Sequence, residues 1–242
     1  MNYVVLALLF SQKKNSVSPR VNITEDYFGY IRDWYNSMTE NRVPGLILHD
    51  GLPEEFIKER TNEFIKFKKV DAEIYNTCDV RWVVYDKFIQ EHGKEYDYIF
   101  ANDISDVTMG KNPFLGDISK YPSNYLFSGD ELASYSNGWI KDRNKQLKEN
   151  LSEVHDHILG NPKLKLFNPG IIGGSPAVMG ELCGYMAELV KRGGPIPRTA
   201  DMSMYNYTLR TYFKGRVIHG SPVNSVFRKF QTNRKDVWFI HK

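Results

Sequence analysis

Hydrophobic residues recur with two spacings along the first half of the chain, and the two spacings alternate. Continuous apolar runs are typical of strands buried on both faces, whereas apolar residues three and four positions apart are typical of helices. The runs predict strands over 3–10, 45–50, 72–75 and 98–101, and the helical spacing predicts a helix from about residue 24. Pro53, followed by acidic residues in the first turn, predicts a helix over 52–67, and a further helix is expected over 81–92. This β-α-β order predicts a largely parallel sheet with helices on both faces.

The second half is less regular. It predicts a strand over 123–131, a loosely helical segment over 135–159, a strand and glycine-containing loop over 164–175, and a helix over 200–213. Another helix is expected from Ser175, a favoured N-cap, to about Val190, with Pro176 in its first turn. We find no repeats or linker, so we expect one domain over 1–242, with one half at 1–120 and the other at 121–242.

Composition narrows the class of protein. With 41% hydrophobic and 25% charged residues, the chain has the composition of a soluble globular protein. A net charge of +3 is too small to indicate nucleic acid binding, although it leaves room for a local phosphate site. Cys78 and Cys183 lack metal-ligand spacing and indicate a reducing compartment, so we expect a cytoplasmic protein. The first apolar run is too short to span a bilayer, so we expect no membrane span.

One stretch carries candidate chemistry. YDYIFANDISDVTMGKNPF (96–114) leads an apolar strand directly into Asn102, Asp103 and Asp106. In parallel α/β sheets, ligands bind beyond the carboxyl ends of the strands. Two carboxylates on one turn can converge on a hard cation, and oxygen ligands suit Mg²⁺ or Mn²⁺. The alternative is a solvated turn in which Asp103 or Asp106 caps a short helix.

This stretch resembles the metal-binding element of nucleotide-sugar-dependent glycosyltransferases of the GT-A fold. Those enzymes combine an apolar strand, Asp-X-Asp or Asp-X-X-Asp, and then Asp/Asn-Pro-Phe/Trp. Ile104 stands where an Asp-X-Asp element would have its first Asp, so the match is to the Asp-X-X-Asp variant. The resemblance leaves open whether Asp103 or Asp106 contacts the metal.

Two later segments follow in the order that the family requires. FNPGIIGGS (167–175) resembles the loop against which the donor sugar lies, which implies Gly173 and Gly174 as positions of close approach. TADMSMYN (199–206) resembles the segment that places an acidic side chain near the reacting carbon, here Asp201. The alternatives are an ordinary strand-to-helix turn for the glycines and a helix cap for Asp201.

The family also implies residues at the ends of the sheet. DVWFIHK resembles the strand whose histidine completes the metal site, which implies His241 as a ligand and Lys242 beside the diphosphate, with His219 as the rival third ligand. Arg81 stands where a residue touches the nucleotide or steadies the Asp cluster, although a surface salt bridge is the alternative. Ser11 and Gln12 stand where the nucleobase and ribose are received.

The resemblance implies a GT-A fold: a Rossmann-like, mostly parallel sheet flanked by helices, with a smaller acceptor-side subregion. It implies that 1–120 is the nucleotide-binding half and 121–242 the acceptor and sugar half. It implies transfer of a sugar from a nucleoside diphosphate sugar, UDP being the commonest nucleotide, to a glycan hydroxyl with Mn²⁺ or Mg²⁺. With inversion, which we favour slightly, Asp201 would accept the hydroxyl proton, with Asp130 or Glu131 behind it. With retention, Asp201 or Asn206 would line the donor's other face.

Small enzymes of this kind occur in bacterial surface-polysaccharide pathways and in large algal viruses. If the chain is viral, the expected location is the cytoplasm of the host cell. The stop after Lys242 suggests a catalytic domain cut from a longer protein. Two other functions remain open. A sugar-phosphate nucleotidyltransferase would need a glycine-rich basic loop after the first strand, for which SQKKNS is a poor substitute. A non-catalytic carbohydrate-binding module would hold a structural Ca²⁺ on the same carboxylates.

Overall fold

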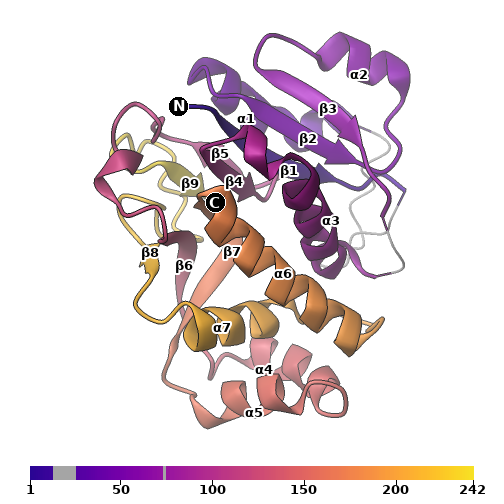
Figure 1. The fold of residues 1–242 in the computed structure, drawn as a ribbon, viewed down its shortest axis with the longest axis vertical. Helices are drawn as coiled ribbons and strands as arrows, with labels where there is room; N and C mark the ends of the chain where they lie inside the picture. The colour runs from indigo at the N-terminus through magenta and orange to yellow at the C-terminus, as the bar shows by residue number, and fades with distance from the viewer. Residues whose placement is uncertain (13–25, 73–74) are drawn as a thin grey trace.

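A computed structural model describes residues 1–12, 26–72 and 75–242 (Figure 1). Its strands are β1 (Tyr3–Leu9), β2 (Gly45–His49), β3 (Ile65–Lys69), β4 (Tyr98–Asn102), β5 (Val107–Met109), β6 (Leu126–Ser134), β7 (Lys165–Gly174), β8 (Val217–His219) and β9 (Phe239–His241). Its helices are α1 (Tyr27–Glu40), α2 (Glu54–Arg60), α3 (Thr77–His92), α4 (Gly138–Asn144), α5 (Ser152–Gly160), α6 (Pro176–Gly193) and α7 (Asp201–Tyr212).

The main sheet has seven strands in the order β3-β2-β1-β4-β7-β6-β8. Neighbouring strands are parallel except at β7, which is antiparallel to both β4 and β6. The mostly parallel α/β sheet confirms the expected class and is consistent with a Rossmann-like fold. Strand order reverses at β1, which lies between β2 and β4, so the carboxyl ends of β1 and β4 meet at a topological switch point.

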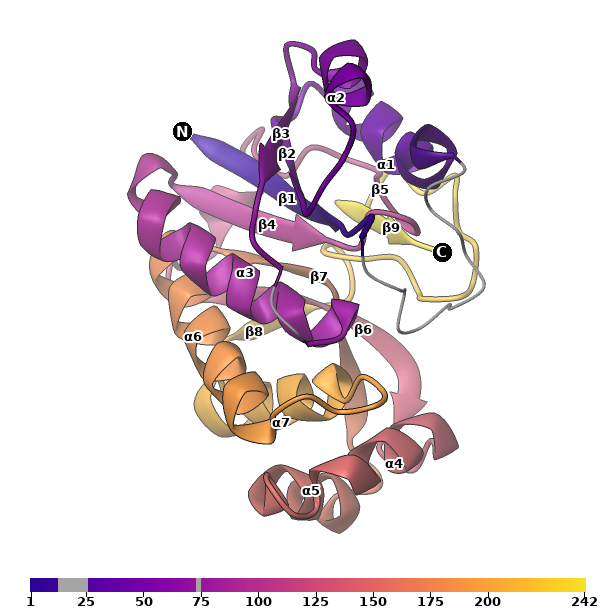
Figure 2. The same cartoon turned by 90° about the vertical axis from the view of Figure 1, so that its right-hand side faces the viewer.

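Two hydrophobic cores cover the two faces of this sheet. Along β1, Val4 and Leu6 belong to the core shared with α3 and α6, whereas Val5, Ala7 and Leu9 belong to the core shared with α1. Side chains alternate between faces along a strand, so a continuous apolar run is required where both faces are covered. Figure 2 shows α3, α6 and α7 on one side of the sheet and α1, β5 and β9 on the other.

The helices and strands of the first half differ from the expected ones in their bounds. The helix expected over 52–67 ends at Arg60, because the side-chain oxygen of Asn62 accepts the backbone N–H groups of Phe64 and Ile65 and turns the chain into β3. The strand β3 therefore begins at Ile65, and the strand expected over 72–75 falls partly outside the described residues, which leave out 73 and 74. The helix expected from about residue 24 begins at Tyr27 with Asp26 as its N-cap.

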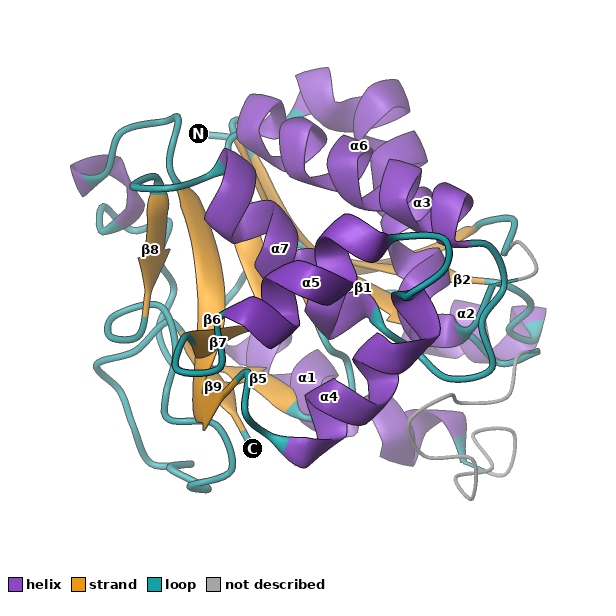
Figure 3. Ribbon diagram, turned by 90° about the horizontal axis from the view of Figure 1, so that it is seen from below, coloured by secondary structure: helices purple, strands orange, loops and turns teal. Residues whose placement is uncertain are grey.

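The second half completes the sheet and adds a small helical layer. Ser175 caps α6 as expected, whereas the expected strand and loop over 164–175 is one continuous strand, β7. Helices α4 and α5 lie beside α7 at one end of the molecule (Figure 3), around a separate small core. The buried members of that core are Tyr135, Ile140, Ile158, Leu166 and Met202.

We examined whether any helix could span a membrane. None of those in the described part of the chain is both long enough and apolar enough to cross a bilayer.

Candidate metal centre

Three potential metal ligands converge at the carboxyl end of β4. Asp103 directly follows β4, Asp106 precedes β5, and His241 is the last residue of β9. In the antiparallel β5–β9 pair Val107 lies opposite His241, and the Lys242 N–H donates to the Asp106 carbonyl oxygen at 2.9 Å. One donor atom from each of the three candidate ligands lies within 4.8 Å of the others.

The donor set fits a divalent cation. Two carboxylates and one imidazole supply oxygen and nitrogen donors of the kind that Mg²⁺, Mn²⁺ and other transition metals accept. His241 is only 1% exposed, yet neither its Nδ1 nor Asp106 Oδ1, both buried, has a hydrogen-bond partner within residues 1–12, 26–72 and 75–242. Buried polar atoms are ordinarily paired, so these two atoms point to a missing partner. Among the described residues His241, and not His219, belongs to this group of ligands.

A glycine lines the centre. A Cβ added at Gly170, in β7, would lie 2.6 Å from Cε1 of His241 and 2.9 Å from Oδ2 of Asp103. Neither contact can be accommodated without movement of a ligand. The Gly170 backbone is held in place because its N–H donates to Oδ1 of Asn168 at 2.8 Å and its carbonyl oxygen accepts the N–H of Asp103 at 2.9 Å.

Arg81 joins the centre to a second, buried acidic group. Its Nη1 donates to Oδ1 of Asp103 at 2.7 Å, and its Nη2 donates to Oδ2 of Asp201. Burial alone would lower the pKa of this guanidinium, but the carboxylates of Asp201 and Asp103 raise it above its ordinary value. Arg81 is therefore a permanent positive charge behind Asp103 and not an ordinary surface residue.

The pKa of Asp103 is raised. Burial of the carboxyl group is the main cause, although 40% of the side-chain surface remains exposed, and Asp106 adds to it, while Arg81 and His241 oppose it. Asp103 therefore releases its proton less readily than an ordinary aspartic acid, and a bound cation would favour the deprotonated form.

Asp201 lies with Asp79 in the buried group. The Thr199 hydroxyl is 3.0 Å from Oδ1 of each carboxyl group, and both aspartates are 3% exposed. Burial, followed by the neighbouring charge of Asp201, raises the pKa of Asp79 to about 7. With Arg81 and Thr199 as its partners, Asp201 is engaged in the interior and does not face an open site.

The side chain of Lys242 contacts helix α1. Its ammonium group donates to Oδ2 of Asp33 in α1, and this hydrogen bond is the main cause that lowers the pKa of Asp33. Lys242 directly follows His241, one of the three candidate ligands, but its side chain is paired with Asp33 of α1 and not with those three residues.

Ser11 and Gln12, at the end of β1, are organised by Asp50 at the end of β2. Oδ1 of Asp50 accepts the N–H of Ser11 at 2.7 Å and its hydroxyl at 3.1 Å, and Oδ2 accepts the N–H of Gln12 at 3.1 Å. Asn102 is buried at the end of β4, and its Oδ1 has no partner within the described ranges. All three predicted residues thus lie at the carboxyl edge of the parallel strands.

Gly173 and Gly174 lie inside β7, where they pair with Phe100 and Ile99 of β4. A Cβ at Gly173 would lie 2.3 Å from the Phe100 ring, and a Cβ at Gly174 would lie 2.3 Å from Cγ1 of Val178. Close packing in the core accounts for both glycines, and Gly170 is the glycine of this segment that borders the ligands.

Two further carboxylates lie on β6. Asp130 accepts a hydrogen bond from His219 at 2.8 Å if that nitrogen is protonated, and one from Asn224 at 3.0 Å. Glu131 accepts the side-chain amide of Asn168 at 3.0 Å, the residue that also fixes Gly170. Burial raises the pKa of Glu131, whereas Asn168, Arg228 and His241 oppose the shift.

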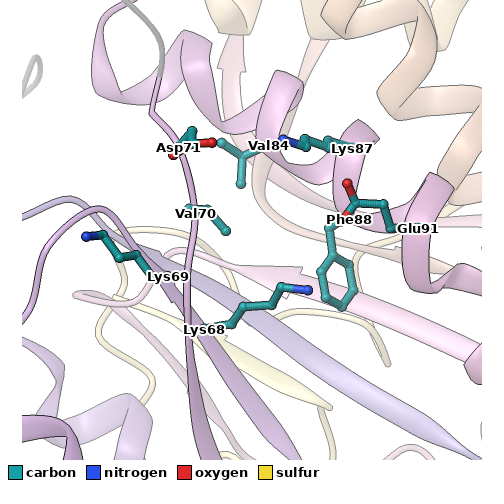
Figure 4. A pocket seen from close by; sticks show the side chains of 8 residues that line it. All are labelled: Lys68, Lys69, Val70, Asp71, Val84, Lys87, Phe88 and Glu91. Atoms are coloured by element: carbon teal, nitrogen blue, oxygen red, sulfur yellow. The ribbon is translucent and has the colours of Figure 1, made fainter. Parts of the chain in front are cut away.

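A separate hollow of about 140 Å³ lies between β3 and α3 (Figure 4). It is lined by Lys68, Lys69, Val70, Asp71, Val84, Lys87, Phe88 and Glu91. Its rim mixes ammonium and carboxylate groups, so their charges largely offset one another and it has no strong preference for an anion.

Sequence comparison adds no assignment. No protein-family model matches this chain, and no curated protein is significantly similar to it. A functional assignment therefore depends on the geometry of the site.

Proposed function

We propose that this chain is a metal-dependent glycosyltransferase of the GT-A type. It would transfer a sugar from a nucleoside diphosphate sugar, with UDP as the expected nucleotide, to a glycan hydroxyl. The observation that carries the proposal is the convergence of Asp103, Asp106 and His241 at the switch point between β1 and β4. This is where open α/β sheets bind nucleotides, and an oxygen-rich cation site there suits a diphosphate.

Each residue has a role in this proposal. Asp103, Asp106 and His241 would hold Mn²⁺ or Mg²⁺, which when bound supplies positive charge against the charge that develops on the leaving diphosphate. Arg81 fixes the orientation of Asp103. Ser11 and Gln12, whose backbone Asp50 orders, stand where the nucleoside would lie.

The proton acceptor is better assigned to Glu131 than to Asp201. Asp201 is buried and bound to Arg81, which leaves it no access to an acceptor hydroxyl. Glu131 is partly exposed and reaches the centre through Asn168, and its raised pKa makes it a stronger base than an ordinary glutamate. Asp201 then serves the site by holding Arg81. Asp130 is the weaker candidate, because the effect of burial on its pKa is outweighed by its hydrogen bonds with His219 and Asn224, which lower the pKa and make it a weaker base.

A turnover assay tests the proposal. The protein is incubated with Mn²⁺ and a panel of nucleotide sugars, and the release of nucleoside diphosphate is followed. We expect release from one donor, its loss in Asp106→Ala, and unchanged release in the control Asp156→Ala at an exposed position of α5. Pyrophosphate released from a nucleoside triphosphate would indicate a nucleotidyltransferase instead. Absence of both reactions, with Ca²⁺-dependent glycan binding, would indicate a binding module.

A further inference from the structure

The hydroxyl of Thr199 lies between two buried carboxyl groups. Its Oγ1 is 3.0 Å from Oδ1 of Asp79, in the first turn of α3, and 3.0 Å from Oδ1 of Asp201, at the start of α7. The same oxygen accepts the backbone N–H of Asp201 at 3.4 Å. Thr199 is 1% exposed and each aspartate 3%, so bulk water does not reach these contacts.

The number of available protons limits how these contacts can be made. A threonine hydroxyl has one proton to donate and two lone pairs to accept with. If both carboxyl groups were ionised, Thr199 could donate to only one of them. The other contact would bring two lone pairs together in the interior, where an unpaired acceptor is costly. One additional proton removes the conflict, because one carboxyl group then donates to Thr199 while Thr199 donates to the other.

The surrounding groups decide which carboxyl group carries that proton. Asp201 faces the guanidinium of Arg81, which favours its charged form. Asp79 has the side-chain amide of Asn76 on its other oxygen, and this amide is neutral. The charged groups nearest Asp79 are Arg81 on its own helix and Asp201 across from it. Burial and the charge of Asp201 together outweigh the opposing effects of Asn76, Thr199 and Arg81 on its pKa.

We propose that Asp79 is a positioning residue that carries a proton near neutral pH and, through Thr199, leaves Asp201 free to hold Arg81 against Asp103. The proton would stay on Oδ1 of Asp79 and be donated in a hydrogen bond to Oγ1 of Thr199, whose own proton is donated to Oδ1 of Asp201. Release of this proton places a second negative charge beside Asp201. Both carboxylates then interact with the single positive charge of Arg81. Whether or not the chain transfers sugars, the protonation of Asp79 remains the same.

Asp79→Asn tests the protonation directly. Asparagine keeps the size of the side chain and can donate to Thr199, but it does not titrate. A carboxyl group whose pKa is raised in the folded chain stabilises it below its unfolded pKa, and this contribution is lost as pH rises through the folded value of about 7. Between the two pKa values, the unfolding constant of the wild type should therefore rise about tenfold per pH unit relative to that of the variant.

Urea unfolding from about pH 5 to about pH 8.5 measures this ratio. We expect the ratio of the wild-type to the Asp79→Asn unfolding constant to grow by about 100-fold up to about pH 7 and then to level off. Glu188→Gln, at an exposed position of α6, is the matched control and should show no such growth. A ratio that stays constant over the whole range means that Asp79 is ionised and that its role is structural only.

Infrared spectroscopy provides a second measurement of the protonation. A protonated carboxyl group has a carbonyl stretch that a carboxylate lacks. The wild type should show this band at about pH 6 and lose intensity above about pH 8. Because the pKa values of Asp103 and Glu131 are also raised, the part of the band that Asp79→Asn lacks is the part assigned to Asp79. Thr199→Ser, which keeps the hydroxyl, should behave like the wild type. Absence of the band at the lower pH would overturn the proposal.

Discussion

Gly170 lies against the imidazole of His241 so closely that a methyl group at this position would be 2.6 Å from Cε1. The glycine belongs to β7 and the histidine to β9, which are in different sheets. Their close approach leaves no room for a side chain between this part of the main sheet and His241.

Gly170→Ala should therefore weaken metal binding more than it weakens the fold. The added methyl group must displace His241 or Asp103, because both lie within 3 Å of its position. We expect the Mn²⁺ affinity measured by calorimetry to fall at least about tenfold, as happens when atoms around a metal site are displaced. Gly138→Ala is the control, because a Cβ there meets nothing within 4 Å. Equal affinities in the two variants would contradict the proposed ligand set.

Metal affinity should rise with pH. The raised pKa of Asp103 means that this carboxyl group keeps its proton to a higher pH than an ordinary aspartic acid does, and only the carboxylate binds a cation. Calorimetric titration with Mn²⁺ at about pH 5.5 and about pH 7.5 should give tighter binding at the higher pH, with proton release at the lower one. Affinity that is independent of pH, or that falls as pH rises, would rule out Asp103 as a ligand.

Replacing Asp201 should destabilise the fold as well as the site. Asp201→Ala removes a buried partner of Arg81 and leaves part of the guanidinium charge uncompensated, for which a loss of about 3–5 kcal/mol is typical. Asp236→Ala removes a carboxylate from an exposed pair with Arg234 and should leave the stability almost unchanged, because solvent screens such pairs. Urea unfolding of both variants gives the comparison. A normally active, normally stable Asp201→Ala protein would show that Asp201 neither holds Arg81 in place nor takes part in turnover.

Lys242→Ala separates metal binding from diphosphate binding. The lysine pairs with Asp33 at a partly exposed position, so its removal should cost no more than about 1 kcal/mol of stability. We expect Mn²⁺ affinity to be retained and affinity for UDP with Mn²⁺ to fall, because the ammonium group would leave Asp33 for the diphosphate. Asp33→Asn releases the lysine and should raise UDP affinity. Unchanged UDP affinity in both variants would assign Lys242 to the contact with α1 alone.

Apolar runs and helical spacing correctly predicted several strands and helices of the first half. The strands β1, β2 and β4 are apolar because both of their faces are covered, and α1 shows helical spacing within its own length. The strand β3 was missed because it lies at the edge of the sheet, where IKFKK alternates with lysines and continues the apparent spacing of the preceding helix. The spacing of apolar residues does not distinguish a short edge strand at this place from a continuation of the preceding helix.

The residues of the candidate site could be predicted from sequence where they stand on one turn or where the family resemblance implied them. Asp103 and Asp106 stand on a single turn, and His241 followed from the resemblance. Asp79 and Thr199 could not be found in this way, because they are separated by 120 positions and only the packing of α3 against the start of α7 brings them together. The sequence likewise shows that β7 contains several glycines, but it does not show which side chains each of them faces.

The pairing of β5 with β9 has a consequence for unfolding. A cation held by Asp103 and His241 would act as a reversible crosslink between segments that are far apart in sequence. The ligands come together only in the folded chain, so the binding free energy of the ion adds to the stability of the fold, and it acts where β9 meets the turn after β4. Withdrawal of the ion by a chelator should therefore loosen the last strand from the main body before the parallel sheet itself gives way.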